Sequence, residues 1–277
     1  MKHFFKKLIM LALKILVVLF LTIELYPVVW LFLSSFKAEP EFIKPMYALP
    51  EGVHFQNYTD AFRLSNLGVL FRNTVFVTVS SIAISLVLSA MAAFALIKMK
   101  WRLSGAAAVY LRLGMFIPAF VMLLPQFLMF KSLNLLNTLY VLIIIFGSGV
   151  AMPIYMLMGF YRYVPDEIME ASVIDGCGIY RCFFHIAAPM TLNGYVTVIM
   201  LTFFGVWNDL LISQTFVSSQ SMKMLQVGLA SFVGERSKRE WGPTFASICI
   251  AMLPTLLLYV TLNKNIIQGL SAGAIKG

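Results

Sequence analysis

The sequence has 277 residues, of which 60% are hydrophobic and 12% are charged. This composition excludes an ordinary soluble domain, because a soluble fold has too little interior for so much apolar surface. A net charge of +9 would suggest nucleic-acid binding in a soluble protein, but the placement of the basic residues between apolar segments explains it better. We therefore expect an all-α integral membrane protein with the lipid bilayer as its surroundings and no nucleic-acid partner.

Six apolar segments along the chain predict six transmembrane helices in one membrane domain, residues 1–277. The first segment, 8–36, follows a basic start but is much longer than the ~7–15-residue apolar region of a signal peptide, so we expect a retained span. The others lie at residues 74–97, 113–130, 139–160, 194–217 and 244–262. A helix satisfies all backbone hydrogen bonds internally, as the hydrocarbon region requires.

The distribution of lysine and arginine predicts the orientation. In this layout the N-terminal side of the membrane has twelve of the 21 lysines and arginines, and the other side has nine. The bias is clearest before the first span and in the segment 98–112, which favours a cytoplasmic N-terminus and C-terminus. The basic segment 234–239 is an exception on the outer side. The polar outer segments 37–68 and 218–242 are either solvated connectors or contacts for an extracellular partner.

Small residues recur every fourth position on the second predicted span, at Ser81, Ser85, Ser89 and Ala93. Such spacing lets helix backbones approach closely in a membrane. It predicts that this face packs against another helix.

Between the fourth and fifth predicted spans lies the segment 165–189, PDEIMEASVIDGCGIYRCFFHIAAP. Pro165 followed by two acids favours a helix start, and Asp175-Gly176 should end that helix. A second, more apolar helix is predicted over 179–188, before Pro189. Two short helices at an angle would form a compact knob that fits a groove on another protein.

The residues of this 165–189 knob are similar to a known motif. Glu170-Ala171-Ser172, Asp175-Gly176, Ile186 and Pro189 resemble the EAA loop of ABC-importer permeases. Nearly the whole chain resembles the carbohydrate-uptake branch of that family, the inner permease subunits of maltose-type importers. Further matches are Asn57-Tyr58, Arg72-Asn73-Thr74, Trp207-Asn208-Asp209 and the terminal Gly273-Ala274-Ile275-Lys276-Gly277. The chain departs from the pattern at Ser172 and Cys177, where alanine is usual, and at Ala188, where leucine is usual.

The resemblance implies a complex and a mechanism. The chain would pair with a second, different permease subunit, two ATPase subunits and an extracytoplasmic solute-binding protein in a bacterial or archaeal cell membrane. The knob residues expected to couple to the ATPases are Glu170, Ala171, Ser172, Asp175, Gly176, Ile186 and Pro189. ATP-driven movement of the knob would then switch a central cavity between its inward-facing and outward-facing states.

The sequence indicates no chemistry of its own. It has no G-x4-G-K-[ST] motif, so we expect ATP and magnesium to be bound by the partner ATPases and no cofactor by this chain. No catalytic constellation is present, and the chain is not expected to be an enzyme. A possible metal-binding pattern, C-x4-C-x2-H, is formed by Cys177, Cys182 and His185. It has no fourth ligand, so buried structural cysteines are favoured over a metal site.

Polar and aromatic residues within the predicted spans are candidates for the substrate path. Trp207, Asn208 and Asp209 lie together in the fifth span, where a central aspartate costs about 2.5 to 3.5 kcal/mol by insertion scales. Hydrogen-bonding groups beside an aromatic ring suit a sugar. The alternative is that Asn208 and Asp209 pair with neighbouring helices. Gln126 and Asn73 are further candidates.

The predicted function is therefore transport of a sugar or oligosaccharide as an ABC-importer permease. Two alternatives stay open from the sequence. One is an ABC permease for another solute, such as a polyol, glycerol phosphate or polyamine. The other is an oligomeric channel or a secondary transporter.

Overall fold

The computed structural model describes residues 2–45, 47–99, 101–235 and 240–274. About 81% of the chain is helical, and no strand occurs in the described ranges, which confirms the predicted all-α class. Residues 236–239 of the basic segment 234–239 and residues 275–277 of the C-terminal pattern lie outside the described residues.

Four helical stretches are long and apolar enough to cross a membrane. The first is Phe4–Ser34 in α1 (Lys2–Ser34), and the second is α3 (Leu67–Lys98). The third, Leu139–Arg162, comprises α6 (Leu139–Gly147) and α7 (Ala151–Arg162). The fourth is Trp241–Leu262 in α14 (Trp241–Ala274). Two bent helix pairs pass the same test together. The described chain therefore has four candidate spans, or up to six if each bent pair crosses as one.

The bent pairs correspond to the predicted spans 113–130 and 194–217. The first pair, Ser104–Phe116 and Ala119–Ser132, turns by 96° at Pro118, whose backbone is extended (φ −63°, ψ 136°). Proline has no N–H to continue the helix and disfavours helical geometry in the residue before it. The second pair, Ile179–Met190 and Leu192–Trp207, turns by 79°. Its helix ends at Trp207, so the range 194–217 contains two helices, α11 (Leu192–Trp207) and α12 (Leu211–Phe216).

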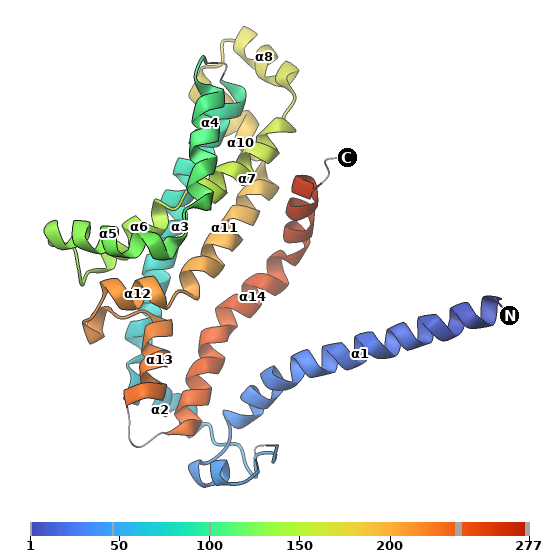
Figure 1. Ribbon diagram of the computed structural model, residues 1–277, viewed down its shortest axis with the longest axis vertical. Helices are drawn as coiled ribbons and strands as arrows, with labels where there is room; N and C mark the ends of the chain where they lie inside the picture. The colour runs from blue at the N-terminus through green and yellow to red at the C-terminus, as the bar shows by residue number, and fades with distance from the viewer. Residues whose placement is uncertain (1, 46, 100, 236–239, 275–277) are drawn as a thin grey trace. The chain divides into compact units, whose positions relative to one another are not determined.

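The chain divides into two compact units (Figure 1). The first comprises Met1–Leu67 and Leu229–Leu253, and the second comprises Gly68–Gly228 and Pro254–Gly277. The remaining helices of the chain are η1 (Glu39–Ile43), α2 (Gln56–Ser65), α4 (Ser104–Leu113), η2 (Gly114–Phe116), α5 (Ala119–Ser132), α8 (Asp166–Ile174), α9 (Ile179–Cys182), the π-helical turn η3 (Phe183–Ala187), α10 (Ala188–Met190), η4 (Gln220–Met222) and α13 (Leu225–Glu235).

In the first unit, carboxylates organise the polar segment 37–68. Glu39 accepts a hydrogen bond from the Trp241 N–H at 2.9 Å, at the start of α14. Glu41, although only 6% exposed, accepts from the N–H groups of Ala38 and Glu51, both at 2.8 Å. The segment is therefore an ordered lobe rather than a loose connector.

The environment of Glu41 lowers the pKa of its carboxyl. Burial by itself raises this pKa, but the Glu51 and Ala38 N–H groups lower it, and the nearby His54 and Lys44 lower it further. The net direction is downward, so the folded lobe favours the ionised form of Glu41.

In the second unit, α7 contacts both α4 and α11, and α8 lies beyond the ends of α4 and α7 (Figure 1). The core at this end includes Ala93, Phe94, Leu157, Tyr161 and Val198. The predicted small-residue face of α3 is buried as expected, since Ser81, Ser85, Ser89 and Ala93 are each at most 1% exposed.

Candidate functional site

The 165–189 knob contains α8 and a second helical stretch close to the one that the sequence predicts. That stretch comprises α9, the π-helical turn η3 and α10, and it ends at Met190, so that Pro189 lies inside it and not after it. Pro165 precedes α8, whose first turn contains Asp166 and Glu167, where the positive end of the helix dipole favours carboxylates. Gly176 follows the helix with φ +80°, and its N–H donates to the Val173 carbonyl at 3.0 Å. Glycine adopts this left-handed conformation without steric cost, which explains why the helix ends here.

The predicted coupling residues do not share one environment. Glu170, Ala171, Asp175, Gly176 and Pro189 are exposed and Ile186 is half-buried. Ser172, by contrast, is buried, and its hydroxyl donates to the Met169 carbonyl at 2.7 Å and lies 3.1 Å from the Cys182 sulfur. The serine that replaces the usual alanine therefore joins α8 to α9 inside the knob and does not face outward.

Large apolar side chains surround these residues on the surface of the knob. Ile174 is 86% exposed, Tyr180 71% and Phe184 61%. Together with the exposed carboxylates of Glu170 and Asp175, they form a mixed apolar and acidic surface.

The knob is attached to the bundle by contacts that the sequence analysis did not identify. The Phe94 ring of α3 packs edge-on against Phe183 at 5.2 Å and against Tyr161 at 5.7 Å. The Tyr161 and Tyr195 hydroxyls share a hydrogen bond between α7 and α11. Lys98, at the end of α3, contacts the start of α8. In the sequence Lys98 is the first of several basic residues after an apolar run, a pattern that indicates only the orientation of the chain.

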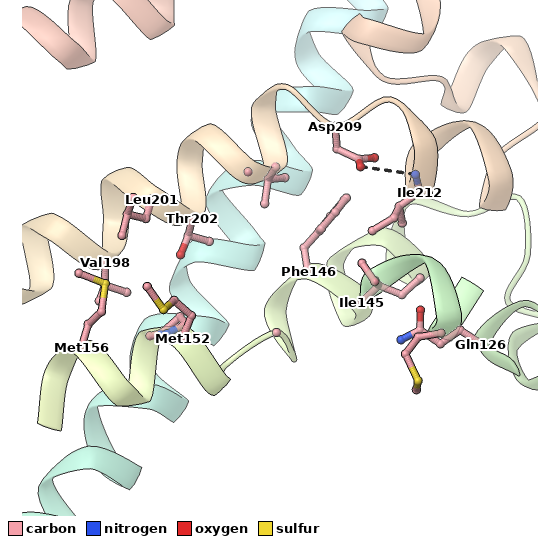
Figure 2. Close-up of a pocket in the computed structure, with 16 residues that line it drawn as sticks. Gln126, Ile145, Phe146, Met152, Met156, Val198, Leu201, Thr202, Asp209 and Ile212 are labelled. Atoms are coloured by element: carbon pink, nitrogen blue, oxygen red, sulfur yellow. Dashed lines mark hydrogen bonds between the residues drawn. The ribbon is translucent and has the colours of Figure 1, made fainter. Parts of the chain in front are cut away.

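A pocket of about 420 Å³ lies within the second unit, between α5, α6, α7, α11 and α12 (Figure 2). Its polar side chains are Gln126, Thr202 and Asp209. The other lining residues are apolar or glycine: Ala119, Met122, Ile145, Phe146, Gly149, Met152, Pro153, Met156, Val198, Leu201, Gly205, Val206 and Ile212. Two of the five predicted path residues, Gln126 and Asp209, thus meet at one cavity.

The other three predicted path residues lie elsewhere. Trp207 is 2% exposed, stacks on Phe203 at 5.2 Å, and packs within the bundle. Asn73 is 1% exposed and donates to the Ser221 and Lys223 carbonyls at 2.9 and 3.1 Å. Asn208 is exposed, and its amide donates to the Phe204 carbonyl at 3.1 Å.

Asp209 has a structural contact as well as a place in the pocket wall. One carboxylate oxygen accepts from the Ser213 N–H and from the Ser213 hydroxyl, both at 2.8 Å. The other accepts a longer bond, 3.4 Å, from the Ile212 N–H (Figure 2). The carboxylate therefore satisfies the first turn of α12, where N–H groups have no partner within the helix.

Among the residues that the structure describes, no group of three or more His, Cys, Asp or Glu side chains could bind a metal ion. Cys182 is buried, and its thiol contacts the Cys177 carbonyl at 3.5 Å. The cysteine pair of the knob thus contributes to its packing.

Apolar spans, a cavity between them and an exposed knob at one end of the bundle are features of a membrane transport subunit that contacts a partner. Comparison with known proteins identifies the family. Residues 85–271 match the family described as binding-protein-dependent transport system inner membrane component. The chain belongs to this family, which confirms the predicted resemblance to ABC-importer permeases and the membrane location.

Individual relatives agree with this assignment. The diacetylchitobiose uptake system permease protein NgcG of Streptomyces coelicolor is 30% identical over 94% of this chain and 87% of its own length. The melibiose/raffinose/stachyose import permease protein MelC of Bacillus subtilis is 30% identical over 88% of each chain. A chain of a bacterial ABC transporter involved in the import of alginate has the same fold. Its TM-score is 0.85 at 20% identity, over 93% of this chain and 96% of that one.

Proposed function

We propose that this chain is one permease subunit of an ABC importer that takes up a sugar or oligosaccharide. It would form a heterodimer with a second permease subunit. Two ATPase subunits, which bind ATP and magnesium, and an extracytoplasmic solute-binding protein would complete the importer. The names of the sugar-uptake relatives support this cargo class. Family membership favours an importer of this kind over a channel or a secondary transporter.

The proposed topology has six spans with both termini in the cytoplasm. It assigns one crossing to each bent helix pair. In the second pair, the half Ile179–Met190 belongs to the knob and would lie at the cytoplasmic end of the crossing, which continues through Leu192–Trp207. It places the 165–189 knob on the same side as the basic segment 98–112, in agreement with the preference of cytoplasmic loops for lysine and arginine.

The observation on which the proposal chiefly rests is the exposed surface of the knob. Exposed apolar side chains grouped with charged ones outside the bilayer are typical of a protein interface. Ile174, Tyr180 and Phe184 would enter a groove of the ATPase subunit, while Glu170 and Asp175 would meet basic groups at its edge. Because the ATPases contact the knob differently in their open and closed states, they would shift the balance between two arrangements of the spans.

The pocket is the proposed site for part of the cargo in one of these states. Gln126 and Thr202 offer hydrogen-bonding groups, and Met152, Met156 and Phe146 offer apolar surface. This combination of an apolar wall with a few polar groups is common among small-molecule sites.

Purification and uptake test the proposal together. The full chain, tagged and isolated from its native membranes, should bring down two ATPase subunits and a second permease. In proteoliposomes with its binding protein, this complex should import labelled melibiose, raffinose or diacetylchitobiose when ATP is present. A chain that purifies alone would overturn the importer assignment. Import of a polyol, glycerol phosphate or polyamine, with no saccharide imported, would overturn the sugar assignment alone.

A further inference from the structure

Lys98 links the end of α3 to the start of α8. Its ammonium nitrogen Nζ lies 2.6 Å from Oδ1 of Asp166 and 2.5 Å from the Val164 carbonyl oxygen. The side chain of Lys98 is only 5% exposed, whereas that of Asp166 is 63% exposed. The two acceptors flank Pro165, the residue from which α8 begins.

The burial of Lys98 makes this contact a positional constraint. An ordinary surface ion pair contributes little to stability, because water competes for both charges. A buried ammonium group, however, has to keep its partners, since leaving it unpaired is strongly unfavourable. The contact therefore favours arrangements in which the first turn of α8 stays beside the last turn of α3.

The far part of α3 is attached to a different region of the same unit. Asn73 donates to the Ser221 and Lys223 carbonyls, and the Thr74 hydroxyl accepts from the Leu225 N–H at 2.8 Å. Between these contacts and Lys98 the helix has no proline. At 1.5 Å per residue its 32 residues extend for about 48 Å. Such a helix can transmit a displacement along its length.

We propose that Lys98 is a positioning residue for coupling, which fastens the knob to α3 so that both move as one body. When the ATPases displace the knob, α3 would carry that movement to the segment 221–225. This inference rests on the proposed function, because it assumes that ATPases act on the knob. The contact itself can be tested without any substrate.

The substrate-independent test measures the distance between α8 and α3. Spin labels are attached through Ile168→Cys on α8 and Met91→Cys on α3, at positions 42% and 45% exposed, after the three native cysteines are replaced by alanine. In the assembled complex the distance distribution should be narrow with lysine or with Lys98→Arg, and should broaden with Lys98→Met. Methionine is the informative replacement, because it fills the space without leaving a buried unpaired charge. An unchanged width in Lys98→Met would overturn the proposal.

The functional test measures saccharide uptake per ATP hydrolysed, using whichever of labelled melibiose, raffinose or diacetylchitobiose the unmodified complex imports fastest. Loss of a coupling contact should lower this ratio at least about fivefold in Lys98→Met, with hydrolysis retained. Lys98→Arg should restore it. Arg102→Met, which removes an exposed cation nearby, should leave it unchanged. A purely structural role would lower uptake and hydrolysis in proportion, and that result would refute the positioning role.

The two tests separate failure of this inference from failure of the proposed function. If the unmodified chain binds no ATPase, the importer assignment fails, whatever the spin-label distances show. If the unmodified complex imports a saccharide normally and Lys98→Met does the same with an unchanged ratio, only the role of Lys98 is wrong.

Discussion

Gly176 offers a direct test of the knob as the ATPase-docking element, through the substitutions Gly176→Trp and Gly176→Asn. Its φ of +80° lies in the left-handed region, and a Cβ built on it would have no heavy atom within 4 Å. A residue other than glycine would therefore be strained in its backbone here, but its Cβ would meet no neighbour within the chain. Docking and folding can thus be separated at one residue.

The expected magnitudes follow from this geometry. The left-handed conformation costs an L-residue about 1 to 2 kcal/mol, and asparagine tolerates it better than most. Both variants should therefore fold and insert. Tryptophan adds bulk to the exposed surface, and overpacking a close interface costs about 1 to 3 kcal/mol. That corresponds to docking weakened by about 5- to 150-fold.

The assay compares the amount of ATPase subunit that co-purifies with each variant, together with saccharide uptake in proteoliposomes. Gly176→Asn should retain most of both, and Gly176→Trp should lose both while its amount in the membrane stays normal. If Gly176→Trp keeps its ATPases and its uptake, the knob is not the docking element. If Gly176→Asn fails as completely as Gly176→Trp, backbone strain rather than bulk explains the loss.

Substitutions at three further sites, with controls, test other parts of the structure. Asp209→Ala should cost about 1 to 2 kcal/mol through the lost contacts to α12 and lower the melting temperature of the complex. Asp209→Asn should retain both stability and uptake. An asparagine variant that assembles but transports nothing would show that the carboxylate meets the cargo. Gly194→Ala would place a Cβ 2.6 Å from the Phe160 ring, so it should destabilise by about 1 to 3 kcal/mol, while Gly159→Ala, with no atom within 4 Å, should be neutral in the same thermal unfolding assay. Folding lowers the pKa of the Glu41 carboxyl, so this group stabilises the fold at pH values above its unfolded pKa, near 4.5. The stabilisation is lost as the pH falls through the folded pKa. The melting temperature should therefore change less between pH 7 and pH 3 in Glu41→Gln than in the unmodified chain, and an equal change would contradict this account.

The helical class and the knob could be predicted because both depend on local sequence. Long apolar runs have few alternatives to helices in a membrane. Likewise, the proline and acids at the start of α8 and the glycine after it act within a few residues of where they stand. The burial of Ser81, Ser85 and Ser89 followed from their spacing alone.

Contacts between distant residues could not be predicted in this way. Asn73 was predicted to line the substrate path, because a polar side chain in an apolar span is costly unless it has a partner. Its hydrogen-bond partners lie about 150 residues further along the chain, where local sequence cannot indicate them. The sequence shows Lys98 only as a basic residue at the end of an apolar run. Nothing in the neighbouring residues indicates that its side chain contacts Asp166. The break after Trp207 was also missed, since the run 194–217 is apolar on both sides of the asparagine and aspartate that interrupt it.

The composition of the pocket has a consequence for the partner permease. A saccharide has several hydroxyl groups around the rim of each ring, and each one that leaves water needs a replacement hydrogen bond. This pocket offers only Gln126, Thr202 and Asp209, and the carboxylate of Asp209 is already engaged by α12. It can therefore bind one apolar or weakly polar part of a sugar but cannot satisfy a whole saccharide. If the cargo is an oligosaccharide and the proposed second permease subunit completes the binding site, we expect most of the hydrogen bonds to come from that subunit. Exchanging it should then change the cargo more than any substitution in this pocket.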